Sequence, residues 1–399
     1  MDNPFEQALP ADWRGIDWEA LPSPAFVVHA DRLQANARIL ADIRAQADVS
    51  ILLALKGFAM FSTFPLLREY LDGTTSSGLH EALLAREFFG QEIHVYAPAF
   101  KDEEIAQLVG FADDLVFNTP TQWLRFRPAV QASGRSIGCG LRVNPGYSEV
   151  AVELYNPCAT RSRLGTPAAW LEHELQQHPD LFDGLDGLHF HTLCEQNADV
   201  LAHTLPYFEK AFAKFFPQLK WVNFGGGHHI TRPDYDRATL VQLLQDFRAR
   251  HGLHIYLEPG EAVALGSGVL VATVLDVFDN EGPVAVLDTS ATTHLPDTLE
   301  MPYRAEIYGA GQPGEHAYTY RLGGLSCLAG DVLGDYSFPE PLKPGQRLLF
   351  ADMAHYTMVK TTTFNGVPLP AICLYQPADT PKMRIVKRFG YENYRERLS

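Results

Sequence analysis

Short apolar runs alternate with longer stretches of helical spacing between residues 25 and 262, and this alternation constrains the fold more than any other feature of the chain. Such alternation is typical of βα units on a parallel sheet. The eight strand candidates are Ile51 to Leu55, Thr74 to Ser77, Ile93 to Ala97, Leu115 to Asn118, Ile137 to Val143, Gly187 to Leu193, Trp221 to Gly225 and Ile255 to Glu258. Eight βα units within about 240 residues predict an α/β fold of the (β/α)8 TIM-barrel type, near the usual size of that barrel.

The pattern changes after Gly260. The runs Val269 to Phe278 and Pro283 to Ser290 follow each other without a helical stretch, and Gly and Pro become frequent beyond them. These features are typical of an antiparallel sheet. We therefore predict a barrel over residues 25–262, a β-sheet domain over 263–399, and an N-terminal segment, 1–24, that packs with the β-sheet domain.

Composition and charge exclude several classes of protein. The chain has 399 residues, of which 46% are apolar, so it can bury a large core and is not intrinsically disordered. Its formal charge of -16 argues against a binder of nucleic acid, because such proteins concentrate Lys and Arg to displace counterions from phosphates. No apolar run of 18 residues suggests a membrane span, and the acidic N-terminus does not resemble a signal peptide.

The five cysteines are an odd number and include no C-x-x-C pair, so neither a disulfide framework nor a structural zinc site is expected. This cysteine usage fits a reducing compartment, and we expect a cytoplasmic protein that binds neither membrane nor nucleic acid.

Lys56 directly follows the apolar strand candidate Ile51 to Leu55. In a barrel this position is the C-terminal mouth, where active sites lie. Loss of hydration there lowers the pKa of an amine and makes it competent to form an imine with an aldehyde. The alternative is a lysine that extends from the strand end into solvent.

Three further strand ends carry polar groups. His189 and His191 alternate in GLHFHTL, and one of them could stack on a planar ring, bind a metal or be a structural imidazole. The triple glycine Gly225 to Gly227 follows WVNF, so its N–H groups could bind a phosphate, although any tight βα turn favours glycine. Glu258, in EPGE, could bind a cation, accept from a protonated ring nitrogen or cap the next segment.

The joint order of these features resembles a known family, the fold type III pyridoxal 5'-phosphate (PLP) decarboxylases. This alanine racemase-like group contains the ornithine, diaminopimelate and carboxynorspermidine decarboxylases. The resemblance spans about residues 22 to 395. The motifs closest to the carboxynorspermidine/carboxyspermidine branch are ALKGF, SRLGT, HFHTLCE, NFGGGHHI, EPGEA, SCLAGD and DMAHYTMVK.

The resemblance implies a role for each matching residue. Lys56 would form a Schiff base with PLP, His191 would stack on the cofactor ring, and Glu258 would pair with the ring nitrogen. The remaining cofactor-binding positions would be Arg142, Gly225, Gly226, Gly227, Gly260 and Tyr356. Cys327 and Asp331 correspond to a loop that enters the active site of the partner subunit in this family, which implies a homodimer.

The resemblance also implies a reaction. PLP is an electron sink for the carbanion left when the substrate loses its carboxylate, and Glu258 would keep the ring nitrogen protonated. Cys327 is the candidate donor of the proton to the substrate carbon. The expected reaction is decarboxylation of carboxynorspermidine, and of carboxyspermidine, to norspermidine and spermidine in polyamine biosynthesis.

Two departures from the family pattern bear on the substrate. Ornithine and diaminopimelate decarboxylases usually read E-P-G-R, whereas this chain has Glu261 at the last position. An acidic group binds an ammonium and repels a carboxylate, which favours an aminoalkyl tail over diaminopimelate. Asp297 and Glu300 fall in the segment that contacts the distal end of the substrate in the family. With Asp331 they complete the predicted set of substrate-binding residues.

Three alternatives remain open. The chain could be another fold type III decarboxylase, for ornithine, arginine or diaminopimelate. It could be a metal-dependent barrel hydrolase or isomerase, with ligands among His189, His191, His228, His229 and Glu258. It could also be a paralogue that binds PLP without turnover. Which of the two polyamines is the product is open as well.

Overall fold

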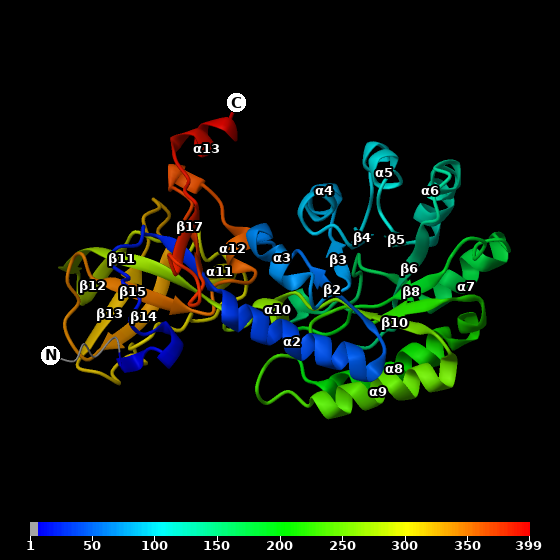
Figure 1. Ribbon diagram of the computed structural model, residues 1–399, viewed down its shortest axis with the longest axis horizontal. Helices are drawn as coiled ribbons and strands as arrows, with labels where there is room; N and C mark the ends of the chain where they lie inside the picture. Colours follow the sequence, from blue (N-terminus) through cyan, green and yellow to red (C-terminus); the bar gives the residue numbers. More distant parts are fainter. Residues whose placement is uncertain (1–6) are drawn as a thin grey trace. The chain divides into compact units, whose positions relative to one another are not determined.

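The computed structural model describes residues 7–399 and divides into two compact units (Figure 1). One unit, here called the barrel unit, comprises residues 34–263. The other, the sheet unit, combines the N-terminal residues up to Leu33 with Ala264–Ser399. The predicted start of the barrel at residue 25 therefore differs from this division, because Ala25–His29 forms strand β1 of the sheet unit.

Eight parallel strands form a closed barrel. Their order is β5-β4-β3-β2-β10-β9-β8-β6, and pairing of β5 with β6 closes the ring. They are β2 (Ser50–Ala54), β3 (Gly73–Ser76), β4 (Glu92–Tyr96), β5 (Asp114–Phe117), β6 (Gly138–Asn144), β8 (Gly187–His189), β9 (Trp221–Asn223) and β10 (His254–Leu257), with the short β7 (Thr166–Pro167) beside β6. The prediction of a (β/α)8 barrel is confirmed, and each strand overlaps its predicted segment.

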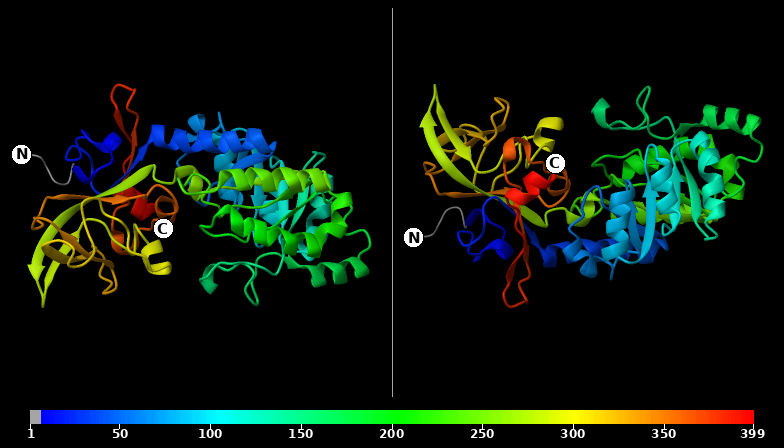
Figure 2. Two further views of the ribbon diagram at one scale, coloured as in Figure 1. Left: turned by 90° about the horizontal axis from the view of Figure 1, so that it is seen from below. Right: turned by 90° about the horizontal axis from the view of Figure 1, so that it is seen from above.

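Helices follow the strands and lie around the outside of the barrel (Figures 1 and 2). The α-helices are α2 (Ala30–Ala47), α3 (Phe64–Leu67), α4 (Leu79–Phe88), α5 (Asp102–Leu108), α6 (Pro120–Ala132), α7 (Ala168–Gln177), α8 (Ala198–Phe212), α9 (Arg237–His251) and α10 (Glu261–Ala264). Short 3-10 helices are η2 (Phe61–Thr63), η3 (Glu153–Tyr155) and η4 (Ala213–Gln218).

Helix α9 shows how the sequence determines where a helix begins and ends and which face it buries. The Asp236 side chain accepts from the backbone N–H of Thr239 at 3.0 Å and so caps the first turn. Gly252 ends the helix in the left-handed conformation, with φ of 69°. The buried face between these ends consists of Leu240, Leu244 and Phe247.

The sheet unit contains an eight-stranded sheet with the order β14-β13-β12-β11-β1-β16-β17, in which β15 also pairs with β11. Its strands are β1, β11 (Gly268–Asp279), β12 (Pro283–Leu287), β13 (Tyr318–Gly323), β14 (Val332–Phe338), β15 (Arg347–Ala351), β16 (Ala371–Tyr375) and β17 (Met383–Lys387). Its helices are η1 (Ala11–Trp13), α11 (Asp297–Glu300), α12 (Thr357–Lys360), η5 (Phe364–Gly366) and α13 (Tyr391–Glu396). The predicted antiparallel sheet is only partly right, because β1 pairs with β16 and β12 with β13 in parallel.

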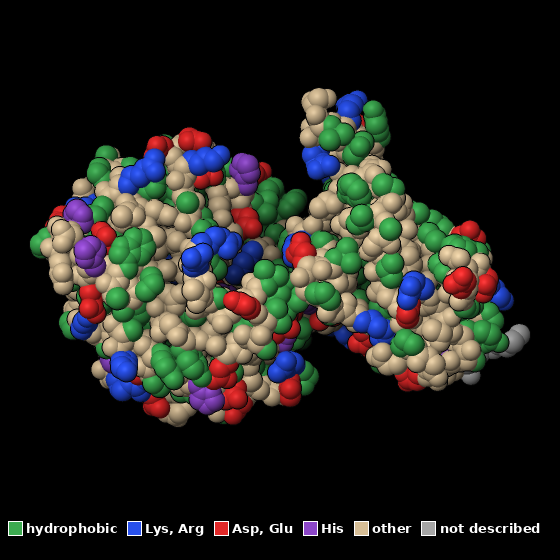
Figure 3. Space-filling model, turned by 180° about the vertical axis from the view of Figure 1, so that it is seen from behind, with side chains coloured by type: hydrophobic (Ala, Val, Ile, Leu, Met, Phe, Trp, Pro, Cys, Tyr) green, Lys and Arg blue, Asp and Glu red, His purple; other side chains and the backbone are tan. Residues whose placement is uncertain are grey.

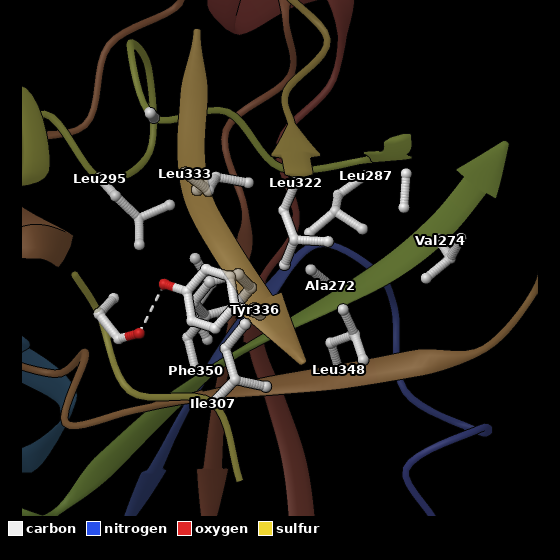
Figure 4. Close-up of a cluster of buried hydrophobic side chains, with 14 of the residues drawn as sticks. Ala272, Val274, Leu287, Leu295, Ile307, Leu322, Leu333, Tyr336, Leu348 and Phe350 are labelled. Carbon is white, nitrogen blue, oxygen red and sulfur yellow. Dashed lines mark hydrogen bonds between the residues drawn. The ribbon is translucent and has the colours of Figure 1, made fainter. Parts of the chain in front are cut away.

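Two apolar clusters stabilise the sheet unit. Figure 4 shows the first, in which Leu322, Leu333, Leu348 and Phe350 surround Tyr336, whose buried hydroxyl donates to the backbone oxygen of Ala305 at 2.6 Å.

In the second cluster, Trp13 and Trp18 of the N-terminal segment pack with Val27, Val269 and Cys373 of the sheet. Leu9, Trp13, Trp18 and Leu21 of the 1–24 segment thus lie in the core of the sheet unit, whereas neighbours such as Arg14 and Glu19 are exposed. Residues 1–6, which also belong to that predicted segment, lie outside the described part of the chain.

Charged side chains of both signs are interspersed on the face shown in Figure 3, so the acidic excess does not form one continuous patch there. The same face has a hollow in the barrel unit with Lys or Arg side chains at its rim and bottom. Across residues 7–399, no helix is both long and apolar enough to cross a membrane.

Candidate active site

The predicted cofactor-binding residues of the barrel unit gather at one rim. Lys56 follows β2, His191 follows β8, the glycine turn Gly225–Gly227 follows β9, and Glu258 follows β10. Because all eight barrel strands are parallel, their carboxyl ends lie at the same end of the barrel. The structure therefore brings these four groups to one mouth.

Lys56 lies in a tight turn at the end of β2. The backbone N–H of Ala54 donates to the Pro259 oxygen at 3.0 Å, and a Cβ at Gly57 would lie 2.8 Å from the Cα of Gly260. The lysine turn and the E-P-G turn are thus in close backbone contact. Gly260 is buried in this contact.

Water reaches the Lys56 side chain, while protein atoms surround it closely enough to reduce its solvation. This loss of solvation lowers the pKa of Lys56, and the positive charge of Arg142 lowers it further. Glu258 and Glu81 act in the opposite direction. A lysine of lowered pKa at a barrel mouth has the properties of an imine-forming amine.

His191 is held by the glycine turn and by Arg142. Its Nδ1 accepts from the backbone N–H of Gly226 at 2.9 Å, and Arg142 donates to its backbone oxygen at 3.3 Å. Burial, and then the charge of Lys56, hold the pKa of His191 well below its usual range. The imidazole is therefore neutral at pH 7. The Arg142 guanidinium itself lies 4.6 Å from the ring centre of Tyr96.

Close backbone packing requires glycine at the positions of this turn. A Cβ at Gly226 would lie 2.2 Å from the backbone oxygen of Glu258, and one at Gly227 only 1.9 Å from the backbone oxygen of Leu193. Gly225 and Gly227 also have φ of 69° and 83°.

Not all three N–H groups of the turn point outward as expected. The N–H of Gly225 donates to Asn223 Oδ1 at 2.8 Å and that of Gly226 donates to His191. The third N–H group, that of Gly227, has no hydrogen-bond acceptor among residues 7–399.

Glu258 is buried, and both of its carboxylate oxygens face polar groups. Oε1 accepts from Asn223 Nδ2 at 2.7 Å, and Oε2 lies 3.6 Å from His189 Nε2. Burial acts to raise the pKa of Glu258, but His189, the hydrogen bond from Asn223 and the charge of Lys56 outweigh it and hold the pKa below its usual value. Glu258 is therefore an anion at pH 7.

The other histidines have protein partners of their own. His228 Nδ1 is 2.9 Å from the Tyr235 hydroxyl, and His229 Nε2 is 3.3 Å from Glu261 Oε2. A barrel metallohydrolase would need three metal-ligand atoms close together. The candidate ligands His189, His191, His228, His229 and Glu258 do not provide three such atoms within 4.8 Å of one another. Among residues 7–399, the group whose donors lie within 4.8 Å of one another is Glu92, His94 and Asp114, where Glu92 and Asp114 are the first residues of β4 and β5.

The sheet unit holds the remaining predicted residues. Cys327 is exposed in the loop between β13 and β14, and its backbone N–H donates to Asn365 Oδ1 at 2.8 Å. Asp331 is buried at the end of the same loop. Its carboxylate accepts from Ser290 Oγ at 2.8 Å and from the N–H of Ser326 at 2.9 Å, so both partners belong to the sheet unit.

Tyr356, Asp297 and Glu300 lie near one another in the sheet unit. Tyr356 caps α12 with a positive φ of 39°, a strained value for a residue with a side chain. Lys360, the last residue of α12, donates hydrogen bonds to the carboxylates of both Asp297 and Glu300 on α11. The two predicted substrate-binding carboxylates therefore have an internal ammonium partner.

Sequence reasoning missed Asn223, Tyr96 and Lys360. Asn223 is the asparagine of NFGGG, two residues before Gly225, so its position at a strand end was a usable signal. The contacts of Tyr96 and Lys360 join residues far apart in the chain, and only the fold reveals them.

The residues of the mouth fit PLP. Lys56 would supply an amine for the aldehyde, His191 a neutral ring, Glu258 an anion for the ring nitrogen, and Gly227 an N–H group for the phosphate. Together with the closed barrel, this donor set fits a barrel enzyme whose cofactor would be held through an imine. Comparison with known proteins gives the family. The chain belongs to the PLP-dependent decarboxylases, because the family model described as "Pyridoxal-dependent decarboxylase, C-terminal sheet domain" matches residues 26–354.

Relatives similar over nearly the whole chain are decarboxylases. A carboxyaminopropylagmatine decarboxylase of Synechocystis sp. is 46% identical over 95% of this chain and 96% of its own. A carboxynorspermidine/carboxyspermidine decarboxylase of Campylobacter jejuni is 42% identical over 94% of this chain and 98% of its own. The crystal structure of C. jejuni carboxynorspermidine decarboxylase complexed with norspermidine has a TM-score of 0.86 and 40% identity, covering 94% of this chain and 100% of that chain. The protein is thus a carboxy-lyase that uses PLP.

Proposed function

We propose that this enzyme decarboxylates carboxynorspermidine and carboxyspermidine to norspermidine and spermidine. The observation that carries the proposal is Glu261, the acidic first residue of α10, directly after the E-P-G turn that packs against the Lys56 turn. Decarboxylases for ornithine and diaminopimelate usually have arginine at this position. The C. jejuni relative and a carboxynorspermidine/carboxyspermidine decarboxylase of Herminiimonas arsenicoxydans, 34% identical over 95% of this chain, support the same substrates.

The barrel residues have complementary roles in this reaction. When bound, PLP supplies the electron sink for the carbanion that decarboxylation leaves. Lys56 supplies the amine that attaches the cofactor, and its lowered pKa favours the neutral, nucleophilic form. Glu258 holds a negative charge where it can keep the ring nitrogen protonated. His191 offers an uncharged imidazole for ring stacking, and Arg142 donates a hydrogen bond to the backbone oxygen of His191.

The sheet unit supplies the remaining roles in this proposal. The Tyr356 hydroxyl binds the cofactor phosphate, and Cys327 donates the proton to the substrate carbon. Glu261, Asp297 and Glu300 select the amine tail of the substrate by charge. Asp331 shapes the Cys327 loop, because its carboxylate is engaged with Ser290 and Ser326.

We further propose that the enzyme is a cytoplasmic homodimer, with active sites shared across the interface. The exposure of Cys327 is compatible with a loop that completes the site of a second copy.

A second candidate substrate is carboxyaminopropylagmatine, favoured by the 46% identity with the Synechocystis enzyme of that name. Its guanidinium end is planar and binds carboxylates bidentately, whereas a terminal ammonium is a compact point charge. The two substrates therefore make different demands on the same acidic residues.

The test is decarboxylation by the purified holoenzyme, measured as carbon dioxide release. The substrates to compare are carboxynorspermidine, carboxyspermidine, carboxyaminopropylagmatine, ornithine, arginine and diaminopimelate. We expect the highest kcat/KM with the first two and no turnover in the Lys56→Ala variant. A preference for diaminopimelate would contradict the role of Glu261, and turnover by Lys56→Ala would contradict the mechanism.

A further inference from the structure

We propose that Asn223 is a positioning residue of the active site, whose single amide fixes Glu258 and the glycine turn in one arrangement. The inference deepens the proposed function and rests on it, because it concerns how the PLP site is built. Asn223 is the last residue of β9 and is fully buried.

Both ends of the Asn223 amide are engaged. Its Nδ2 donates to Glu258 Oε1 at 2.7 Å, and its Oδ1 accepts from the backbone N–H of Gly225 at 2.8 Å. An amide nitrogen only donates and an amide oxygen only accepts. A rotated amide would therefore lose both hydrogen bonds, so the two contacts hold each other in place.

The backbone brings the same two segments together. The N–H of Glu258 donates to the Gly225 oxygen at 2.8 Å, and the N–H of Phe224 donates to the Tyr256 oxygen at 3.0 Å. These bonds continue the parallel pairing of β9 with β10. They fix the main chain but leave the Glu258 side chain free to turn. Among the residues that the structure describes, the Asn223 amide forms the hydrogen bond that fixes the Glu258 carboxylate relative to this main chain.

The other groups that face Glu258 do not replace this hydrogen bond. They are His189, Lys56 and His94. Burial lowers the pKa of His189 to about 4, so His189 is neutral at pH 7, and neither of its ring nitrogens has a hydrogen-bond partner within residues 7–399. Within residues 7–399, Lys56 forms no hydrogen bond with the carboxylate, and its lowered pKa reduces the positive charge that it can offer. Asn223 is therefore the direct hydrogen-bond donor to Glu258.

This arrangement explains why an amide suits the position. Aspartate would keep an acceptor for Gly225 but would place a second carboxylate against Glu258. Two buried carboxylates in contact cannot both remain ionised at low cost, so they would share a proton. The anion that faces the ring nitrogen would be lost or displaced, while the fold of the turn would be retained.

The experiment compares wild type with Asn223→Asp and Asn223→Ser, where the serine hydroxyl is too short to reach Glu258. Apoenzyme is titrated with PLP, and the absorbance of the bound cofactor is followed from pH 5 to pH 10. We expect both variants to bind PLP about tenfold more weakly or worse, as for loss of a hydrogen bond to a charged group. We also expect an altered pH midpoint, and a fall in kcat with little change in KM.

The control is Asn36→Asp, a partly buried amide of α2, outside the barrel, whose Nδ2 donates to the backbone oxygen of Val263 at 3.2 Å. It is expected to lower thermal stability without changing PLP affinity or the pH midpoint.

A double-mutant cycle separates positioning from a general structural effect. If Asn223 acts through Glu258, then Asn223→Ser/Glu258→Ala loses no more PLP affinity than Glu258→Ala alone. Additive losses, wild-type PLP affinity in Asn223→Asp, or equal losses in Asn36→Asp would overturn the proposal. Because the PLP titration contains no substrate, a wild-type enzyme inactive on carboxynorspermidine would refute only the proposed function.

Discussion

Lys360 and Asp297 form an ion pair within the sheet unit, from the end of α12 to the start of α11, and Lys360 also bonds Glu300. The sequence predicted that both carboxylates bind the amine tail of the substrate. With Lys360 present, the three side chains carry one net negative charge. A substrate ammonium that reaches these carboxylates therefore competes with an internal one.

Replacing Lys360 by methionine is expected to strengthen binding of a polycationic substrate. The variant leaves two negative charges for the amine tail, so KM should fall about two- to fivefold, the range that partly exposed ion pairs support. The kcat should not change, and KM should become more sensitive to salt. Lys343→Met removes an exposed lysine of the same unit and should leave KM as it is. An unchanged KM in Lys360→Met would show that Asp297 and Glu300 do not bind substrate.

Glu261→Gln tests the selection of the tail in the barrel unit. The substitution keeps the size of the side chain and removes its charge, so an ammonium loses a charge-assisted hydrogen bond. We expect KM for carboxynorspermidine to rise about tenfold or more, with a smaller effect on kcat. Glu87→Gln, on the exposed side of α4, makes the same change of net charge and should behave as wild type. A KM equal to that of wild type would mean that Glu261 serves only its partner His229, 3.3 Å away.

Cys327 and Asp331 are expected to act on kcat together. Cys327→Ala removes the proposed proton donor, and loss of a general acid typically costs about 10²-fold or more in rate. Asp331→Asn weakens the hydrogen bonds from Ser290 and Ser326 that shape the loop, so it should also lower kcat, with KM nearly constant. Steady-state kinetics of both variants distinguish this role from substrate binding. A large rise of KM in Asp331→Asn, with kcat retained, would restore the earlier assignment of Asp331 to the substrate.

The barrel was predictable from sequence because local pattern determines it. Each strand is a short apolar run and each outer helix has an apolar face, and both signals lie within about 15 residues of chain. Lys56, His191 and Glu258 were found for the same reason, since each lies within two residues of the end of a strand. The place of β1 was not predictable in this way. Its residues AFVVH would suit either unit, and only pairing with β11 and β16, more than 200 residues away, decides the outcome.

The hydrogen bonds of the site were less predictable than its residues. The glycines of NFGGG suggested three N–H groups for a phosphate, but Asn223 and His191 accept two of them. Likewise, Asp297 and Glu300 were identified as acidic groups, but the pattern did not show that Lys360, about 60 residues further along, pairs with them. Sequence spacing gives the type of group at a strand end or loop, whereas its partner depends on tertiary contacts.

Asp114 gives a prediction about stability. It is buried at the start of β5, 3.3 Å from His94, and burial raises its pKa to about 6, with His94 opposing and Glu92 assisting the rise. An aspartate in the unfolded chain has a pKa near 3.9. The folded protein therefore binds this proton more tightly, and the ionised carboxylate destabilises the fold at pH above 6. The cost reaches about 3 kcal/mol there and disappears as the pH falls through 6 towards 4.

Asp114→Asn removes this ionisation, so the variant should unfold at a higher temperature than wild type at pH 8, by a few degrees. Loss of the attraction to His94 offsets part of the gain. At pH 4.5 the difference should fall to about a third, because Asp114 is then protonated in the wild-type fold but still mostly ionised in the unfolded chain. Thermal unfolding at the two pH values measures the effect, with Asp113→Asn as the control, since Asp113 is less buried and pairs with Arg135 at 3.7 Å. A lower unfolding temperature at pH 8 for Asp114→Asn would show that its contact with His94 outweighs the cost of burial.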